Sequence, residues 1–290
     1  TTLPVDGTRI ELGRTTDNQF FNGYMAEVVL IDGTALAPTS FGESDSDSGI
    51  WVPIDVSGLT FGTNGFYLDF KNSANLGNDA NGGTDLTEVG LAATDQSTDT
   101  CVNNFCTLNF LTLQDSAYVL SQGNLRISIG GDNERKAVLG TFGMTSGKWY
   151  WEVMFDSTSG PSYAQIGISD VIEGTEASTE NGKMGYFPYD YGYRGEGGGK
   201  KTNNGTYTNY GASYEAGDTI GVAVDLDNNA IYFSKDGAFQ ASGAVGDPTS
   251  GSNRTNATFN ITAASSTGTG AYFPAIGKEA VEDPVFDFNF

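Results

Sequence analysis

The stretch "DTIGVAVDLDNNAIYFSKDGAF", residues 218–239, decides the fold of this chain. Apolar residues alternate with small or polar residues on both sides of "DLDNN", which is a run of turn-forming residues. A second turn signal, "KDG", follows at residues 235–237. The stretch therefore predicts two antiparallel strands joined by a tight turn, with a second turn directly after them.

The same alternation recurs through the second half of the chain. The segment "GKWYWEVMFDS" places Trp149, Trp151, Val153 and Phe155 on one side of a strand. The segments "GNLRISIG" and "YAQIGISD" alternate in the same way. Short strands at regular spacing, separated by turn residues, predict an all-β fold built as an antiparallel β-sandwich.

The segment "YFPYDYGYRGEGGGKK", from Tyr186 to Lys201, is the most aromatic part of the chain. Its rings at Phe187, Tyr189, Tyr191 and Tyr193 share one parity, which predicts a strand with one buried face. Six residues at the ends of this strand and beyond it are the candidates for ligand contact: Tyr186, Arg194, Lys200, Lys201, Tyr207 and Tyr210. Aromatic side chains stack on sugar rings or anchor protein partners. The alternative is that the aromatic rings pack in the core and at its rim, as alternating aromatic residues in strands usually do.

The charge of the chain excludes some classes of partner. It has 36 acidic and 14 basic residues, for a net charge of −22. Nucleic-acid binding needs a basic face, so we expect no nucleic-acid partner. No stretch reaches the roughly 18 apolar residues of a membrane span, so we expect no membrane insertion.

The chain contains no histidine. Serine–histidine–aspartate triads and histidine-based zinc sites are therefore excluded, and we expect no cofactor and no catalytic residue. A loose calcium candidate is the polar loop with Asp79, Asn81 and Asp85. Asp225 and Asp227 in "DLDNN" could also supply oxygen ligands, but their place in a hairpin favours a structural turn.

The two cysteines are Cys101 and Cys106, in "CVNNFC". Their spacing allows a small disulfide loop and does not match a redox or zinc motif. Two free thiols are the alternative, and the geometry decides between them.

Four motifs in the second half occur in the order typical of one family. They are "GKWYWEV", "IGISD", "YGASYEAGDTIGVAVDLDNNAIYFSKDG" and "YFPAIG". Together they resemble a SPRY (B30.2-like) domain over residues 116–290. The resemblance implies a non-enzymatic binding module whose ligand surface is formed by loops at one end of the sandwich. These loops would be residues 157–163, 171–185, 195–209 and 243–256.

The first half resembles a different module. The segment "FFNGYMAEVVLIDGTALAPTSFGE" is similar to the last strands of a concanavalin A-like (laminin-G-like) domain, here residues 1–43. The segments "GIWVPIDVSGLTFGTNGFYLDF" and "NNFCTLN" resemble the extended connector, here residues 44–115, that follows this module in structural proteins of tailed, often marine, bacteriophages.

These resemblances imply a virion structural protein of a tailed phage, either a fibre, an appendage or a capsid decoration. Its partners would be other virion proteins and further copies of itself, with a trimer favoured, and a glycan or protein on the host surface. Its location would be the virion surface or the extracellular space. Two alternatives stay open: a carbohydrate-active enzyme on a jelly-roll scaffold, and a microbial surface or filament protein.

Overall fold

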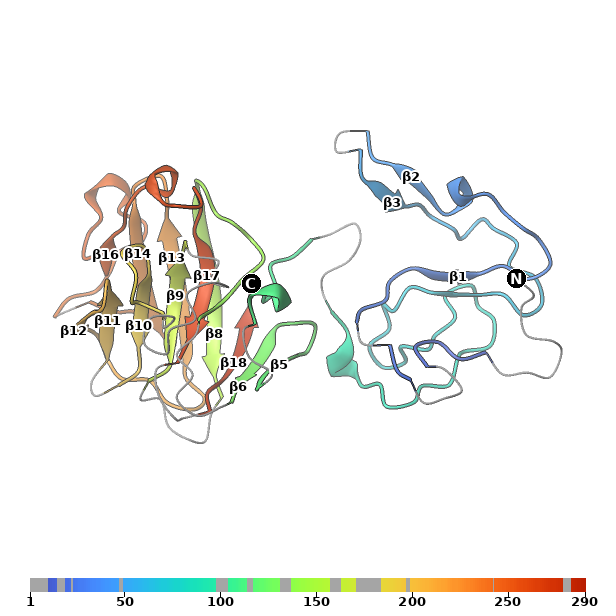
Figure 1. Cartoon of the computed structure of the whole chain (residues 1–290), viewed down its shortest axis with the longest axis horizontal. Coiled ribbons are helices and arrows are strands. Elements are labelled where there is room, and N and C mark those ends of the chain that lie inside the picture. Colours follow the sequence, from blue (N-terminus) through green and yellow to red (C-terminus); the bar gives the residue numbers. More distant parts are fainter. Residues whose placement is uncertain are drawn as a thin grey trace. The chain divides into compact units, whose positions relative to one another are not determined.

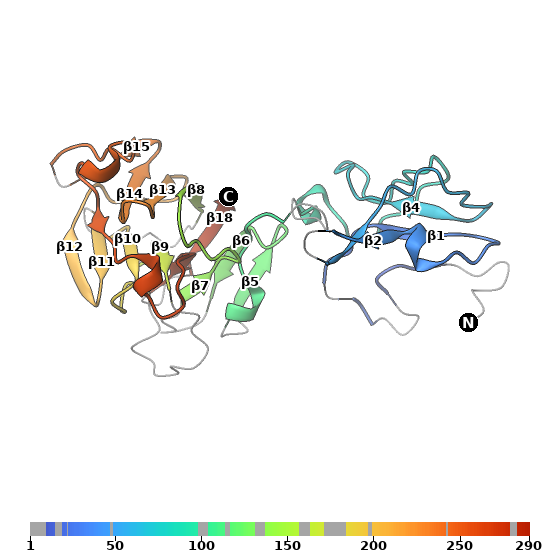
Figure 2. The ribbon, with the colours of Figure 1, turned by 90° about the horizontal axis from the view of Figure 1, so that it is seen from above.

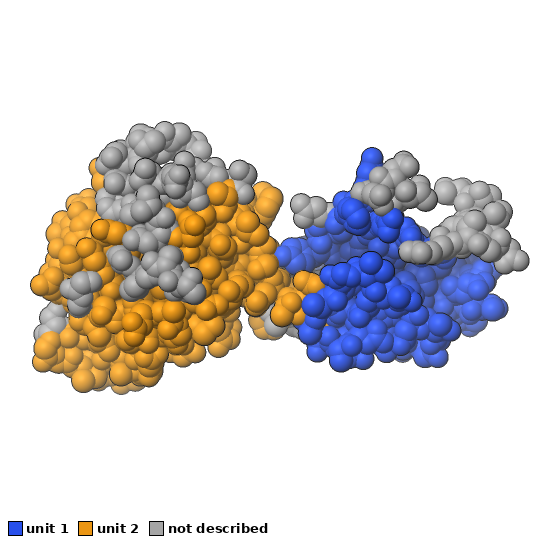
Figure 3. Space-filling model, turned by 90° about the horizontal axis from the view of Figure 1, so that it is seen from below, with its two compact units in different colours: residues 1–93 blue, residues 94–290 orange. Residues whose placement is uncertain are grey.

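The computed structural model describes the chain in twelve stretches: residues 10–14, 19–21, 23–46, 49–97, 104–113, 117–130, 137–156, 163–170, 184–196, 199–241, 243–278 and 283–290. The chain divides into two compact units, which are residues 1–93 (unit 1) and residues 94–290 (unit 2) (Figure 3).

Unit 1 is built from two short antiparallel strand pairs. The pairs are β1 (Val28–Leu30) with β4 (Phe66–Leu68), and β2 (Gly42–Ser44) with β3 (Trp51–Pro53). A 3-10 helix, η1 (Pro38–Ser40), precedes β2, and η2 (Ala93–Asp95) lies where the two units divide. Among the described residues of unit 1, the buried apolar side chains are Val56, Phe61, Phe66, Leu68 and Leu76.

Unit 2 is a sandwich of two antiparallel sheets, which form separate layers in Figure 2. The six-stranded sheet has the order β12 (Thr206–Asn209), β11 (Lys200–Asn203), β10 (Tyr191–Arg194), β9 (Gln165–Ser169), β17 (Phe273–Gly277), β7 (Ala137–Leu139). The larger sheet has the order β15 (Ala238–Phe239), β14 (Ala230–Lys235), β13 (Thr219–Asp225), β8 (Lys148–Phe155), β18 (Val285–Asn289), β6 (Arg126–Ile129), β5 (Tyr118–Ser121), and β16 (Phe259–Asn260) pairs with β14. Most of these strands are labelled in Figure 1, and β7 and β15 are labelled in Figure 2.

Short 3-10 helices complete unit 2. They are η3 (Phe110–Thr112), η4 (Gly251–Asn253) and η5 (Ala264–Ser266). In the part of the chain that the structure describes, no helix has the length and apolar character needed to cross a membrane. The predicted all-β class is therefore confirmed.

The core of unit 2 lies between the two sheets. Side chains of one parity on β8, Trp151, Val153 and Phe155, pack with the inward residues of β9 and β10. Trp149, predicted on the same buried side, is 39% exposed because it lies near the start of the strand. The opposite parity of β8 forms part of the outer face of the larger sheet.

The stretch that decides the fold forms the predicted hairpin. Strands β13 and β14 pair from Ile220 with Lys235 to Asp225 with Ala230. The Asp225 carboxylate accepts hydrogen bonds from the backbone N–H of Asn228 at 3.0 Å and from its side-chain amide at 2.9 Å, which fixes the turn. The second predicted turn is also present, because Asp236 and Gly237 both have positive φ angles, 50° and 78°.

The aromatic segment after Tyr186 forms less strand than its pattern predicts. Strand β10 begins only at Tyr191, because Asp190 organises a turn before it. The Asp190 carboxylate accepts hydrogen bonds from the backbone N–H groups of Gly185 at 3.1 Å and Phe187 at 3.2 Å. The expected strand from Phe187 is therefore corrected to a turn followed by a short strand, in which Tyr191 and Tyr193 are buried as predicted.

Candidate functional site

The structure gathers the six predicted contact residues around one edge of the six-stranded sheet. Arg194 ends β10, Lys200 and Lys201 begin β11, and Tyr207 lies on the edge strand β12. Tyr210 follows β12, and Tyr186 lies in the turn before β10. The turn at Asn204 and Gly205, with φ angles of 49° and 70°, joins β11 to β12 and brings Gly205 next to the Tyr186 ring.

Arg194 has a structural position. Its side chain is buried, and its guanidinium lies over the rings of Tyr163 at 4.5 Å and Tyr207 at 4.8 Å. It also forms an ion pair with Glu196 at 2.9 Å. A guanidinium held between two rings and a carboxylate orders the end of the strand, and its exposure of 4% leaves little surface for a ligand.

Tyr210 belongs to the interior. Its ring packs edge-on against Tyr193, with 5.4 Å between the ring centroids. Its hydroxyl donates to the carbonyl oxygen of Gln240 at 2.7 Å and lies 2.7 Å from the Thr258 hydroxyl. Burial raises the pKa of Tyr210 to about 12, so the phenol stays neutral.

The two lysines differ in the contacts of their ammonium groups. The Lys201 ammonium donates to the Thr258 carbonyl at 2.7 Å and lies 4.8 Å from the centre of the Phe259 ring. Burial lowers the pKa of Lys201. Lys200 is half-buried and lies 3.9 Å from Glu196. Tyr186, Lys200, Lys201 and Tyr207 are therefore the partly exposed members of the predicted set, and of the two lysines it is Lys201 whose ammonium group is bonded to a backbone carbonyl.

The predicted calcium loop is organised by hydrogen bonds to its own backbone. The Asp79 carboxylate accepts from the N–H groups of Tyr67 at 2.9 Å, Asn81 at 3.0 Å and Gly83 at 3.1 Å. Asp85 accepts from the Asp79 N–H at 3.0 Å. The described residues form no group of three or more acidic, cysteine or histidine side chains that could hold a metal ion. Asp79 and Asp85 thus shape a loop.

Cys106 is a buried free thiol next to β7, and burial raises its pKa. Cys101 lies outside the described residues, as do residues 157–162, 171–183 and 197–198 of the expected ligand loops. The expected loop 243–256 is described over its whole length. It covers part of the outer face of β14, where Tyr232 is buried.

A pocket that the sequence reasoning missed lies on the outer face of the larger sheet. We call it the outer-face pocket; it has a volume of about 250 Å³. It is lined by Lys148, Trp149, Tyr150, Ala223, Val224, Asp225, Phe239 and Pro248. The sequence feature that indicates this pocket is the outward-facing set of residues on β8. In this set Tyr150 and Met154 are exposed beside the small residues of β13.

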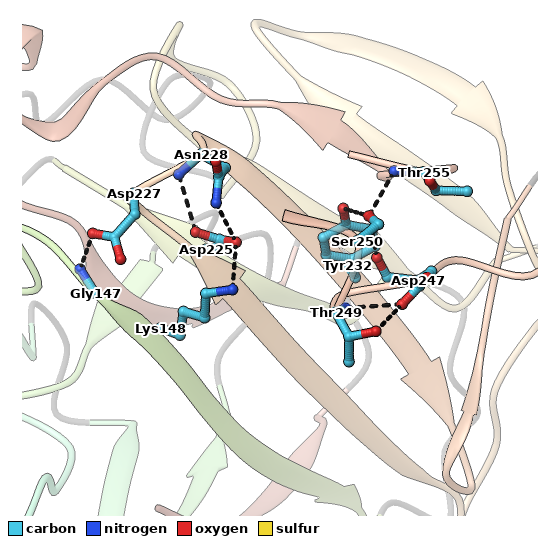
Figure 4. A network of polar contacts seen from close by, with 10 residues as sticks. All are labelled: Gly147, Lys148, Asp225, Asp227, Asn228, Tyr232, Asp247, Thr249, Ser250 and Thr255. Carbon is cyan, nitrogen blue, oxygen red and sulfur yellow. Dashed lines mark hydrogen bonds and ion pairs between the residues drawn. The ribbon is translucent and has the colours of Figure 1, made fainter. Parts of the chain in front are cut away.

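A polar network holds the rim of the outer-face pocket (Figure 4). Lys148 forms an ion pair with Asp225 at 3.2 Å, and Asp227 accepts a hydrogen bond from the Gly147 N–H at 2.8 Å. Burial opposes the ionisation of Asp225, but the hydrogen bonds from Asn228 and Lys148 outweigh it and lower its pKa. The carboxylate is therefore charged and fixed in place.

Comparison with known proteins identifies the second half of the chain. Residues 148–280 match the family model of the SPRY domain, so the chain contains a SPRY domain over these residues. Ran-binding protein 9 of Danio rerio is 32% identical over 124 residues, which are 41% of this chain and 20% of the relative. The ATP-dependent RNA helicase DDX1 of Xenopus laevis is 32% identical over 97 residues, 33% of this chain and 12% of the relative. The chain thus spans about a fifth or less of the length of these relatives.

Solved SPRY structures are also among the matches. The PSpry domain of TRIM65 aligns with a TM-score of 0.43 and 13% identity, covering 64% of this chain and 92% of that domain. The SPRY domain of human HERC1 aligns with a TM-score of 0.38 and 15% identity, covering 61% of this chain and 90% of that domain.

These findings correct the expectation of a phage virion protein. The curated relatives include Ran-binding proteins 9 and 10 and a helicase from eukaryotes, among them Homo sapiens and Drosophila melanogaster. The fibre, appendage and capsid-decoration roles, and the virion-surface or extracellular location, are therefore wrong. The concanavalin A-like module at residues 1–43, the virion partners and the homotrimer find no support.

Proposed function

We propose that this chain is a non-catalytic module that binds a partner protein through its SPRY domain. SPRY domains mediate protein–protein interactions, and they and the Ran-binding protein 9 and 10 relatives are generally non-catalytic. The observation that carries the proposal is the SPRY match over residues 148–280. The division of the first half at residue 43 into a module and a connector stays a prediction.

The chemistry of the described residues supports a binding role. A glycoside hydrolase needs two carboxyl groups facing one cleft at about 5–10 Å. The lining of the outer-face pocket includes one carboxylate, Asp225, which is already paired with Lys148. The buried Asp190 is held by Ser169 at 2.6 Å and by backbone N–H groups, as expected of a structural carboxyl.

We place the partner contact on the edge formed by β11, β12 and the turn before β10. Tyr186, Lys200 and Tyr207 are partly exposed there. Half-exposed tyrosines are common anchors in protein interfaces because they combine a large apolar ring with a polar end. The buried Arg194 beneath Tyr207 stiffens this edge, which lowers the entropy cost of binding.

Ran is the first partner to test, because the relatives are named for binding it. Purified Ran would be titrated into the chain in a calorimeter. We expect saturable binding that weakens about tenfold in Tyr207→Ala, as for an interface anchor. Val119→Ala is the matched control, since Val119 is exposed on β5 at the edge of the other sheet.

Two outcomes would contradict this proposal. If Ran binds equally well to Tyr207→Ala and to Lys200→Ala, the partner contact is not on this edge. If Ran does not bind, this partner is wrong. Turnover in a polysaccharide screen that detects released sugar would overturn the non-catalytic role itself.

A further inference from the structure

We propose that the outer-face pocket binds a lysine or arginine side chain in an extended, basic segment of a partner protein. This is a second site, with a ligand chemistry different from that of the β11–β12 edge. It depends on the proposed function in one respect, which is that the ligand side chain belongs to a partner protein.

The hollow itself follows from small residues on β13. Ala223 lies opposite Tyr150 in the pairing of β13 with β8, and Val224 lies opposite Trp149. Gly221, the next residue on the same side as Ala223, lies under Tyr150: a Cβ there would come within 2.6 Å of the tyrosine hydroxyl. Because the outward-facing positions Gly221 and Ala223 of β13 have no large side chain, a depression remains between Tyr150 and Phe239.

The walls of the pocket are preorganised. The Asp247 carboxylate accepts hydrogen bonds from the Thr249 N–H at 2.9 Å and hydroxyl at 2.6 Å, which fixes the loop around Pro248 (Figure 4). The Ser250 hydroxyl donates to the Asp247 carbonyl at 2.7 Å and accepts from the Thr255 N–H at 2.8 Å. A ligand would therefore meet a formed pocket, with little loop ordering left to oppose binding.

The charge of the rim favours a cationic ligand. Acidic side chains on the lining elements and the adjoining turn and loop are Glu152, Asp225, Asp227 and Asp247, and the basic side chains on the same parts are Lys148 and Arg254. Lys148 is already paired with Asp225, and the whole chain carries a net charge of −22. This field attracts a basic segment and repels phosphate groups and a second copy of the chain.

The lining selects the kind of cation. Trp149, Tyr150, Phe239 and Pro248 provide apolar surface, which suits the aliphatic part of a long side chain. Aromatic faces also attract ammonium and guanidinium groups. Glu152 accepts a hydrogen bond from the Tyr150 hydroxyl at 2.7 Å, so a carboxylate lies at the polar end of this lining ring and can pair with the charged end of such a side chain. A volume of about 250 Å³ is below the usual range for drug-sized ligands and suits one or two side chains.

The test uses the whole chain and three labelled Gly-Ser peptides that differ at one central position: arginine, its neutral counterpart glutamine, or glutamate. Binding would be followed by fluorescence anisotropy at low salt. We expect the arginine peptide to bind at least tenfold more tightly than the glutamine peptide, and the glutamate peptide not to bind. Equal binding of the arginine and glutamine peptides would overturn the proposal.

Variants separate the pocket from general attraction to an acidic protein. Glu152→Gln should weaken the arginine peptide about fivefold, and Tyr150→Ala about tenfold. Glu43→Gln is the matched control, because it removes the same charge from an exposed position in unit 1 and should change the affinity less than twofold. Lys148→Gln removes the cation at the rim and should tighten binding. If Glu43→Gln weakens binding as much as Glu152→Gln does, the attraction is nonspecific and the proposed site is wrong.

The outcome is independent of the protein-partner test above. Loss of peptide binding in these variants, with Ran binding unchanged, would place the two ligands on two surfaces. An arginine peptide that fails to bind, while Ran binding depends on Tyr207, would remove this site and leave the proposed function in place.

Discussion

Two groups of aromatic side chains in unit 2 differ in what their polar ends contact. In the interior, the hydroxyls of Tyr193 and Tyr214 donate to the backbone carbonyls of Ala212 and Ala164. In the outer-face pocket, the Tyr150 hydroxyl donates to the Glu152 side chain, and the ring is 51% exposed. The interior rings thus fasten loops to the core, whereas Tyr150 and Trp149 at the pocket are partly exposed to solvent.

This difference teaches how to separate structural aromatics from candidate binding residues. Tyr193 contacts the rings of Tyr210, Tyr214 and Phe233, with centroid distances of 5.4 to 5.6 Å. Such a cluster loses packing and a backbone hydrogen bond together when one ring is removed. We expect the half-exposed Tyr150 ring to be removable with little effect on folding, so an effect on binding alone would identify its role.

The largest expected effect is that of Tyr193→Ala. Removing a fully buried ring leaves a cavity and an unpaired Ala212 carbonyl, so the free energy of unfolding should fall by about 3–5 kcal/mol. Denaturant unfolding followed by circular dichroism measures this. Tyr193→Phe, which keeps the ring, should cost only about 1 kcal/mol. A loss below about 1 kcal/mol for Tyr193→Ala would show that these rings are not the main support of the core.

The second effect concerns a carboxyl in the interior. Burial raises the pKa of Asp190 to about 6 from 3.8, despite its hydrogen bonds from Ser169 and the backbone. The folded state therefore holds the proton more tightly than the unfolded chain. The resulting stabilisation is complete below about pH 4 and is lost as the pH rises through about 6, a change of roughly 3 kcal/mol.

Unfolding measured between pH 4 and 7 should show this loss in the unmodified chain but not in Asp190→Asn. Asp225 at the rim should change the stability with pH in the opposite direction. Its folded-state pKa is lowered, so the stabilisation it contributes is lost as the pH falls. Asp225→Asn should thus remove stability at neutral pH and little at acidic pH. Identical pH profiles for Asp190→Asn and the unmodified chain would refute the assignment of Asp190.

The smallest effect is expected for Tyr150→Ala. The ring is half exposed on the outer face, and surface substitutions of this kind usually change stability by less than about 0.5 kcal/mol. The same denaturant measurement checks it. A loss above about 1.5 kcal/mol would mean that Tyr150 supports the sheet, and the contrast between the two groups of rings would disappear.

The sequence predicted the sandwich because period-2 patterns depend on local burial. Ile220, Val222 and Val224 of β13 and Trp151, Val153 and Phe155 of β8 are buried as their alternation requires. The alternation predicted the wrong structure before Tyr191. The rings from Phe187 favour a strand, but the buried Asp190 carboxyl binds backbone N–H groups and turns the chain there. Side-chain hydrogen bonding of this kind competes with strand formation and leaves the alternation unchanged.

The candidate site was harder to predict than the fold. Arg194 and Tyr210 follow the aromatic pattern, but their burial depends on Tyr163, Phe233 and Thr258, which are distant in sequence. The outer-face pocket joins Tyr150 to Phe239 across strand pairing, and its depth depends on Ala223 being small. Neither the burial of Arg194 and Tyr210 nor the outer-face pocket therefore corresponds to a motif within one stretch of the sequence.

The three tryptophans of the chain occupy different optical environments. Trp149 and Trp151 are two residues apart on β8, yet Trp149 is 39% exposed beside the outer-face pocket and Trp151 is 3% exposed in the core. Trp51, 52% exposed, lies in unit 1. Because indole emission shifts with solvent contact, Trp149 serves as a built-in fluorophore for occupation of the pocket and Trp151 as one for the integrity of the sandwich.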